Sequence, residues 1–296
     1  MKVSISMKIN YKIGIVDAGK TLLQYIEGYA LGKSKIHHLF EEKRIKVNEK
    51  CEGRNYYLKE NDIVQIDYRE TRDFLPDKKK LDIVYEDDYL LIVNKPKNIL
   101  VHPDDKSKSG TMCNIVSYYY QNKNLDLSIK YAHRLDIDTT GILIFAKDSL
   151  TLAKLDDMIK THELARVYLC IVKGHFKEKT GTIDLPIGED RHHQQRKRVS
   201  KTGKSAITQY AVLEEFEKYS LVKVKLKTGR THQIRVHMAH IGHAIAGDKL
   251  YGGDEAKRPM LHSYEVTFFH PVTHLQIHLL KDMPFDMKEF IKKQAK

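Results

Sequence analysis

Residues 131–148 read YAHRLDIDTTGILIFAKD, and in this stretch a charged segment runs directly into an apolar one. Residues 139–141 are small and break any helical pattern, and the segment after them is almost continuously hydrophobic. An apolar run of this length after such a break is typical of a strand that is buried on both faces. The stretch therefore predicts a polar loop that leads into a buried strand, a position where catalytic carboxylates are often held.

Two carboxylates, Asp136 and Asp138, lie two residues apart in that loop. Two Asp at this spacing can act as general acid and base, bind a divalent ion, or form a turn. The spacing alone favours the turn, so the role of the pair depends on what the other segments of the chain contain.

Short strand patterns and helical patterns alternate around this loop. A helix capped by Asp148 or Ser149 is expected after the stretch, followed by a strand at 167–174. A strand, a turn and a helix are expected within 219–243. Because short turns join many of the strands, we expect an α+β fold around a mixed, largely antiparallel sheet.

The beginning of the chain differs from the remainder. Residues 21–40 show two short helical patterns, with Ser34 placed to cap the second, and strand-like alternation follows. Residues 71–80 are rich in charge and poor in core residues, which predicts a linker. We therefore expect a small helix-helix-strand domain at 1–70, followed by the linker and a second domain at 81–296.

The composition indicates a soluble globular protein with a polyanionic partner. Of the 296 residues, 41% are hydrophobic, and 51 Lys plus Arg against 39 Asp plus Glu give a formal net charge of +12. This excess favours nucleic acid as the partner, with a membrane surface second. No apolar run reaches the roughly 20 residues that span a bilayer, and no signal-peptide pattern is present. The three cysteines lie far apart, which fits reduced thiols in a cytoplasm.

Two basic clusters support a nucleic-acid partner. Six cations without an intervening acid lie within residues 191–204, a segment that reads as a basic loop, and the expected contacts are Arg196, Lys197, Arg198 and Lys201. The second cluster flanks the second N-terminal helix. There the amides of the helix start and nearby cations are expected to hold phosphates, through Lys33, Ser34, Lys35 and Arg44.

The segment HMAHIGH places three histidines at three-residue spacing, His237, His240 and His243. This spacing can direct two side chains at one ion, but no Cys, Asp or Glu lies within the run and no HExxH motif is present. The sequence therefore predicts no metal site, and the histidines are expected to pack or to face phosphates.

The preceding segment, TGRTHQIRVHM, contains two arginines, Arg230 and Arg235. Five residues separate them, so on a regular helix they do not share a face and one can point inward. A buried Arg needs a carboxylate partner, and Asp136 or Asp138 would serve.

Several separated segments together resemble the RluA-type pseudouridine synthases. The family pattern HRLDxxTSGxxxxAK is matched by residues 133–147, with Thr140 where Ser is usual, and KPxGxxVHP by residues 95–103, with Asn98 in place of Gly. Asn tolerates a left-handed backbone better than most residues. The likeness continues to about residue 290 through VYLCIVKG, GKSAITQY, TGRTHQIRVHM, IAGDKLYGG and MLHSYEVTFFHP. The N-terminal segment resembles the S4-like RNA-binding domain that often precedes this fold.

The resemblance implies an enzyme that isomerises uridine in RNA to pseudouridine. The bond between uracil N1 and ribose C1′ breaks, the base rotates, and C5 bonds to C1′. No redox change or external group is needed, so no cofactor is expected. Asp136 is implied as the carboxylate that acts as nucleophile at C1′ or as base at C2′, and Arg235 as the cation that keeps it ionised and oriented. Asp138 matches no catalytic position and is expected to be a turn or supporting residue.

The same matches imply how the target nucleotide is held. A base inside a helix must be flipped out of the stack before it can react. Tyr168 is implied to stack on the flipped base, Leu261 to lie across the pocket, and Arg134 to fill the gap left in the RNA. His133 and Arg230 of the same motifs are expected to contact the substrate.

The expected partner is structured RNA, with large-subunit ribosomal RNA as the implied target and transfer RNA as the alternative. We expect a monomer that binds neither a membrane nor a small-molecule cofactor. Two other classes of function compete with this interpretation. A non-catalytic RNA binder would not need Asp136, Tyr168 and Arg235 together, and a metal-dependent hydrolase would need the histidines of residues 237–243 as ligands.

Overall fold

The computed structural model describes residues 3–72, 74–104, 108–191, 193–254 and 256–294. Its centre is a ten-stranded sheet in the order β4 (Ile83–Glu86), β5 (Leu90–Lys95), β7 (Thr140–Ala146), β14 (Leu261–Phe269), β8 (Ala165–Lys173), β13 (Tyr219–Leu226), β12 (Ile207–Glu215) and β9 (Thr180–Asp184), with β6 (Lys130–Tyr131) beside β7 and β15 (Gln276–Leu280) beside β14. Among the pairings of the described strands, β7 with β14 is parallel and the others are antiparallel. The expected α+β fold with a mixed, largely antiparallel sheet is confirmed.

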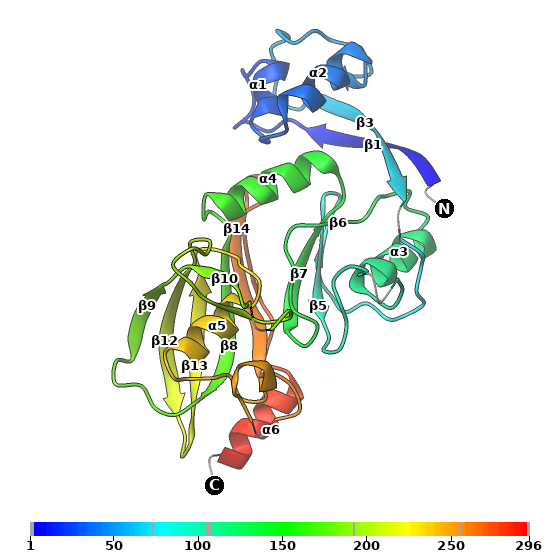
Figure 1. Cartoon of the computed structure of the whole chain (residues 1–296). Helices are drawn as coiled ribbons and strands as arrows, with labels where there is room; N and C mark the ends of the chain where they lie inside the picture. Colours follow the sequence, from blue (N-terminus) through cyan, green and yellow to red (C-terminus); the bar gives the residue numbers. More distant parts are fainter. Residues whose placement is uncertain (1–2, 73, 105–107, 192, 255, 295–296) are drawn as a thin grey trace.

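Helices cover this sheet at several points (Figure 1). They are α3 (Met112–Asn122), α4 (Ser149–Lys160), α5 (Gln233–His240), α6 (Phe285–Gln294) and the short 3-10 helix η1 (Lys249–Tyr251). The expected cap of α4 is confirmed, since the Asp148 side chain accepts a hydrogen bond from the Thr151 amide. Helix α5 follows the strand and turn that the sequence predicts, and it lies over the part of the sheet built by β8, β12 and β13.

The buried strand of the opening stretch is β7, and all seven of its residues are buried. Gly141 explains the break of small residues that precedes it. Its φ is 109°, and a Cβ atom at this position would lie 2.1 Å from the main-chain oxygen of Ser263 on β14. Only glycine allows this approach. The parallel pairing of β7 with β14 therefore brings the loop before β7 next to the start of β14.

A second, three-stranded sheet lies at the N-terminal end, in the order β1 (Val3–Lys12), β3 (Ile63–Arg72) and β2 (Ile45–Val47). The two expected helices are present as α1 (Leu22–Glu27) and α2 (Lys33–Glu41). The prediction that Ser34 caps the second helix is wrong, because Gly32 is the N-cap and Ser34 lies inside the helix. Strand β1 was not predicted, although apolar Met7, Ile9 and Tyr11 alternate with polar residues along it.

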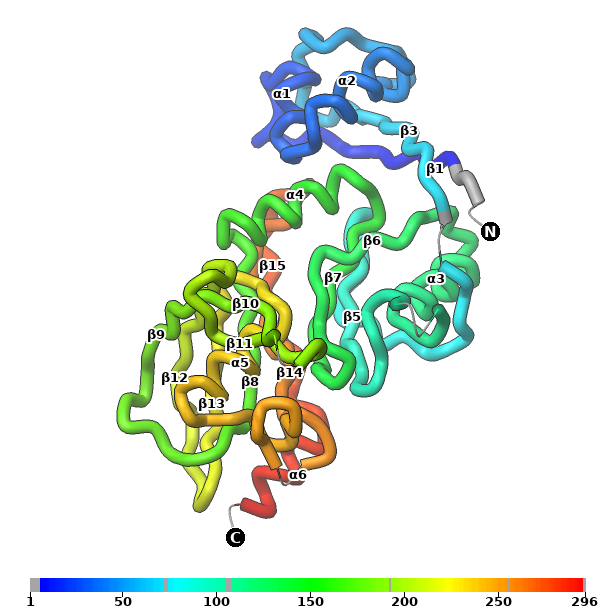
Figure 2. Tube along the Cα trace, viewed as in Figure 1, coloured from blue at the N-terminus to red at the C-terminus, as the bar shows by residue number. Residues whose placement is uncertain are grey.

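The N-terminal unit packs on the end of the large sheet at α4 (Figure 2). The Tyr11 and Tyr68 hydroxyls are 2.7 Å apart, and Tyr68 donates to Asp148 at 3.4 Å. The Tyr11 ring stacks on Tyr89, with centroids 5.4 Å apart. Asp148 is fully buried, and burial raises its pKa. The residue that caps α4 therefore also anchors the N-terminal unit.

The basic segment 191–204 is only partly a loop. Residues Lys197–Val199 form β11, which pairs with β10 (Ile187–Glu189) in a separate hairpin. The prediction of a continuous loop is therefore wrong in its middle, while residue 192 lies outside the described residues. No helix in the described part of the chain is long and apolar enough to cross a membrane.

Candidate active site

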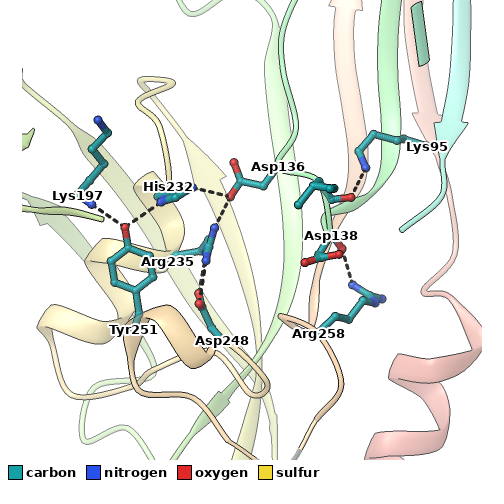
Figure 3. Close-up of polar contacts among 10 residues, drawn as sticks. Lys95, Asp136, Asp138, Lys197, His232, Arg235, Asp248, Tyr251 and Arg258 are labelled. Carbon is teal, nitrogen blue, oxygen red and sulfur yellow. Dashed lines mark hydrogen bonds and ion pairs between the residues drawn. The ribbon is translucent and has the colours of Figure 1, made fainter. Parts of the chain in front are cut away.

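Asp136 lies in the loop between β6 and β7, and its side chain is 28% exposed. Arg235, on the first turn of α5, points toward it. Arg235 NH1 donates to Asp136 Oδ2 at 2.9 Å, so the inward arginine and the carboxylate expected from the sequence do pair (Figure 3). An Arg to carboxylate bond in a partly buried setting fixes both charge and orientation.

A second carboxylate holds Arg235 from behind. Asp248 is 1% exposed and accepts from Arg235 Nε at 2.7 Å and from NH2 at 2.9 Å. Burial by itself lowers the pKa of Arg235, but its bonds to Asp248 and to Asp136 outweigh burial and raise that pKa. Arg235 is therefore a permanent cation whose planar group is fixed on one side and presents NH1 to Asp136.

An aromatic residue connects this pair to the basic hairpin. The Tyr251 oxygen accepts from the Lys197 main-chain N–H at 2.9 Å, and the hydroxyl bonds to His232 Nδ1 at 2.9 Å. His232 Nε2 lies 3.9 Å from Asp136 Oδ2. Burial lowers the pKa of His232, which favours a neutral ring. The Tyr251 ring also lies 5.1 Å from the Arg235 guanidinium, close enough for a cation–π contact.

A buried lysine holds the main chain of the Asp136 loop. Lys95 is 0% exposed, and its ammonium donates to the carbonyl oxygens of Ile137 at 2.8 Å, Ile99 at 2.7 Å and Pro96 at 2.9 Å. Burial lowers the pKa of Lys95 to about 7. Only the charged form has three N–H donors for these three acceptors. The peptide after Asp136 is thus tied to the segment 95–99.

A buried arginine holds the next peptide of the same loop. Arg258 is 4% exposed, and its NH1 donates to the main-chain oxygen of Asp138 at 3.0 Å (Figure 3). Its Nε and NH2 bond to the two carboxylate oxygens of Asp286 on α6, both at 2.8 Å. Asp138 bonds to Arg258 through its main-chain carbonyl and not through its carboxylate, which fits the turn or supporting role expected for that residue.

Tyr168 and Leu261 lie on neighbouring strands behind the loop. Tyr168 is 4% exposed on β8, and burial raises the pKa of its hydroxyl. Leu261 is 4% exposed and begins β14 directly beside β8. Both expected pocket residues are therefore in the sheet that carries the Asp136 loop, and both are rigidly placed.

The three other expected substrate contacts differ in exposure. Arg134 is exposed two residues before Asp136, and Arg230 is exposed while its Nε donates to the Ser205 carbonyl at 2.9 Å. His133 is buried, at 8% exposure. The two arginines can therefore reach an RNA backbone or stack directly, whereas His133 can contact only a group that enters the protein.

The basic residues expected to bind RNA do not all face solvent freely. Lys33, Ser34, Lys35, Arg196, Arg198 and Lys201 are exposed. Lys197 is different, because its ammonium pairs with Glu189 and its main chain bonds to Tyr251. Arg44 is also engaged, since its Nε donates to the Asp67 carbonyl at 2.7 Å. Lys197 and Arg44 are thus occupied in holding their own strands.

Two of the three histidines of the HMAHIGH segment are engaged with the protein, and His240 is exposed. His237 is buried, with Nδ1 2.8 Å from Thr208 Oγ1 and Nε2 2.9 Å from the Leu185 oxygen. His243 Nδ1 lies 2.9 Å from the Lys173 oxygen. Within the described ranges, no group of three or more His, Cys, Asp or Glu side chains is arranged to hold a metal ion.

Comparison with known proteins agrees with this geometry. The family model described as RNA pseudouridylate synthase matches residues 89–240. Among curated proteins, "Uncharacterized RNA pseudouridine synthase YhcT" of Bacillus subtilis is 40% identical over 262 residues, covering 86% of this chain and 87% of that one. The chain belongs to the RNA pseudouridine synthase family. "Ribosomal large subunit pseudouridine synthase D" of Escherichia coli is 34% identical over 278 residues, covering 88% and 85%.

A solved structure supports the fold of this synthase. "Human RNA Pseudouridylate Synthase Domain Containing 4" superposes with a TM-score of 0.61 at 21% identity, covering 72% of this chain and 92% of that one. The human chain aligns over most of its length with less than three quarters of the synthase described here, and at this identity the likeness shows the fold alone.

Sequence reasoning missed three residues of the synthase that hold the Asp136–Arg235 pair: Lys95, Asp248 and Arg258. Two of them had a usable signal, because Lys95 lies in KPKNILVHP and Asp248 in IAGDKLYGG, both segments that resemble the family. A lysine at the end of an apolar strand is also rarely buried unless polar groups inside the protein bind it. Arg258 had no such signal, since the two residues that it joins, Asp286 and Asp138, lie 28 and 120 positions away.

Proposed function

We propose that Asp136 is the catalytic carboxylate of this RNA pseudouridine synthase and that structured RNA, large-subunit ribosomal RNA in particular, is its substrate. The observation that carries the catalytic role is the fixed contact of Asp136 with Arg235, which Asp248 holds in place. A partly exposed carboxylate with one buried cation is poised to act on a ribose brought to it from outside.

The reaction divides into bond cleavage, rotation and rejoining. When the N1–C1′ bond breaks, its electron pair stays with uracil, and Asp136 either bonds to C1′ or takes the C2′ proton. Uracil then turns so that its C5 forms the new bond to C1′, and Asp136 is released or returns the proton. The proton on C5 is then lost while N1 gains one, so the product is a neutral isomer of uridine. Tyr168 and Leu261 keep the detached base in the pocket, Arg134 fills its place in the RNA, and Arg235 keeps Asp136 oriented.

The remaining substrate contacts come from exposed cations. Arg230 and the hairpin residues Arg196, Arg198 and Lys201 lie on the α5 side of the site and bind the backbone near the target nucleotide. Residues 1–70 act as an S4-like RNA-binding domain through Lys33, Ser34 and Lys35, residues 71–80 as the linker, and residues 81–296 as the catalytic domain. The first domain packs against α4, so its basic residues lie at a fixed distance from the basic residues beside Asp136. Two separated basic surfaces suit a large folded RNA.

Two experiments test these assignments. Asp136→Asn and Asp136→Ala are expected to abolish uridine conversion while the affinity for RNA stays within about twofold, and normal turnover in both variants would disprove the catalytic role. Pseudouridine is then mapped across total RNA from cells with and without the protein. A site lost from large-subunit ribosomal RNA supports the proposed target, whereas a site lost only from transfer RNA favours the alternative.

A further inference from the structure

Beside Tyr168, several polar atoms of buried side chains lack a hydrogen-bond partner among the described residues. Arg166 is 5% exposed, His133 is 8% exposed and Ser263 is fully buried. The Arg166 Nε and both ring nitrogens of His133 have no hydrogen-bond partner among the described residues, and the Ser263 hydroxyl has only the Tyr168 hydroxyl beside it. Arg166 also forms no ion pair with a described carboxylate. Buried polar atoms are almost always bonded, so a cluster of unbonded ones indicates a ligand that belongs there.

These side chains lie together at the proposed base pocket. Arg166 and Tyr168 are two residues apart on β8 and so project from the same face of the sheet. Ser263 is directly opposite Tyr168 on β14. Arg166 also lies close enough to His133 to contribute, after burial, to lowering the pKa of that histidine to about 3. A neutral His133 offers one donor and one acceptor nitrogen.

A glycine makes room for the arginine. A Cβ atom at Gly229, in the turn before α5, would lie 3.2 Å from Arg166 NH1. A larger residue at this turn would press on the guanidinium. The space for an unpaired cation is therefore shaped by the same TGR segment that leads to Arg235.

We propose that Arg166, His133 and Ser263 bind the polar edge of the target uracil, and that Arg166 stabilises the negative charge of the ring after the N1–C1′ bond breaks. The electron pair of that bond leaves with uracil and spreads onto its carbonyl oxygens, and it returns to C1′ when C5 forms the new bond. A buried cation beside that ring acts at the step where charge develops.

The hydrogen-bonding pattern favours uracil over a backbone phosphate. The edge of uracil carries two carbonyl acceptors and one N–H donor, so it can satisfy the donors of Arg166 and Ser263 and the acceptor nitrogen of His133. A phosphate offers acceptors only and would leave that nitrogen unbonded. The inference rests on the proposed function, because it assumes that the base flipped toward Asp136 reaches Tyr168.

The test compares Arg166→Met and Arg166→Lys with wild type on two in vitro transcripts of large-subunit ribosomal RNA, one made with uridine and one with 5-fluorouridine. Single-turnover cleavage of the N1–C1′ bond, the RNA Kd and its salt dependence are measured in the full-length protein. Fluorine withdraws electrons, so the detached fluoro ring carries its charge with less help. Lys147→Met is the matched control, because Lys147 is a buried cation that is paired, with Glu86 at 2.8 Å.

We expect Arg166→Met to slow cleavage of the N1–C1′ bond in the uridine transcript by about 10²–10³-fold, as for loss of one preorganised donor. The Kd for RNA should be unchanged. The loss should be clearly smaller on the 5-fluorouridine transcript, and Arg166→Lys should recover part of it. The melting temperature of Arg166→Met should not fall, because the substitution removes an unpaired buried charge that costs stability. The melting temperature of Lys147→Met should fall, because that substitution breaks a buried ion pair.

If wild type still converts uridine, three results would overturn this inference alone. The first is normal turnover in Arg166→Met. The second is an equal loss of rate on both transcripts, with weaker RNA binding and a salt dependence of the Kd reduced by about one phosphate contact, and the third is a lower melting temperature of Arg166→Met with no recovery of rate in Arg166→Lys. The second result assigns the group to a phosphate and the third to structure. Absence of product from wild type would overturn the proposed function together with this inference.

Discussion

Replacing Arg258 by Met removes the side chain that joins the Asp136 loop to helix α6. Arg258 donates to the Asp138 carbonyl at 3.0 Å and forms two 2.8 Å bonds to Asp286. Removing one partner of a buried ion pair costs about 3–5 kcal/mol in the free energy of unfolding. Because the Asp286 side chain is 25% exposed and Lys97 lies 3.1 Å from it, water and one cation remain for the carboxylate. We therefore expect a loss near the lower end, about 3 kcal/mol.

The same change should reduce turnover without weakening RNA binding. Arg258 is buried and its three guanidinium nitrogens all bond to protein acceptors, so it is not expected to contact RNA directly. Its loss frees the Asp138 carbonyl, two residues after Asp136, and leaves Lys95 as the remaining cation on this part of the loop. A displacement of about 1 Å in a catalytic group can cost about 10²-fold in rate, and we expect a fall in kcat of that order.

The turnover measurement on Arg258→Met needs a control variant that loses stability without moving the Asp136 loop. Lys147 follows the far end of β7 and is also a buried cation, with Glu86 and the Asp87 carbonyl as its partners. Lys147→Met should lose comparable stability in urea unfolding but retain the wild-type single-turnover rate. If Arg258→Met and Lys147→Met lost turnover equally at matched fractions folded, the argument that Arg258 positions Asp136 would be refuted.

Three further predictions follow from the partners of the site. Asp248→Asn should lower kcat by at least tenfold and the free energy of unfolding by about 1–3 kcal/mol, since one charge-assisted bond to Arg235 is lost; an unchanged kcat in steady-state assays would contradict this. The bonds to Arg258, chiefly, lower the pKa of Asp286 from 3.8, so the stability that this pair contributes is present above that value and lost as the pH falls below it. The difference in unfolding free energy between wild type and Asp286→Asn should therefore narrow below about pH 4, and a difference that stays constant in acid would be inconsistent with the pair. Tyr251→Phe should keep the ring contacts but cost about 1–3 kcal/mol through the unsatisfied main-chain donor, which urea unfolding can measure.

The local parts of the fold were predictable because their signals lie within short windows. The break at Gly141 and the apolar run after it specify β7, and the Asp148 cap specifies the start of α4. The need of an inward arginine for a carboxylate was also predictable, but it left Asp136 and Asp138 as alternatives, and the resemblance to the family singled out Arg235 with Asp136. For β7 and the start of α4, the residue types impose a physical requirement that their own segments reveal.

The parts that sequence reasoning missed depend on contacts between distant segments. Ser34 is a good N-cap residue, but the N-cap of α2 is Gly32, two residues earlier, which makes no side-chain cap hydrogen bond. Arg258 carries no local sign that it is buried, and its position depends on β14 and α6 packing on either side of it. Propensity describes one segment at a time, whereas these choices are made by tertiary packing.

Besides Arg235, three buried cations around the site show which charges serve the structure and which is available to the substrate. Lys95 and Arg258 are surrounded by protein acceptors, and each bonds a carbonyl of the loop that follows Asp136. Their charge is satisfied whether or not RNA is present, so their effect on the reaction is through the position of the loop. Arg166 lacks such acceptors in the described structure. Burying an unpaired charge costs stability, and this charge gains a compensating interaction only when the substrate binds. The unpaired cation is therefore the one expected to act on the substrate itself.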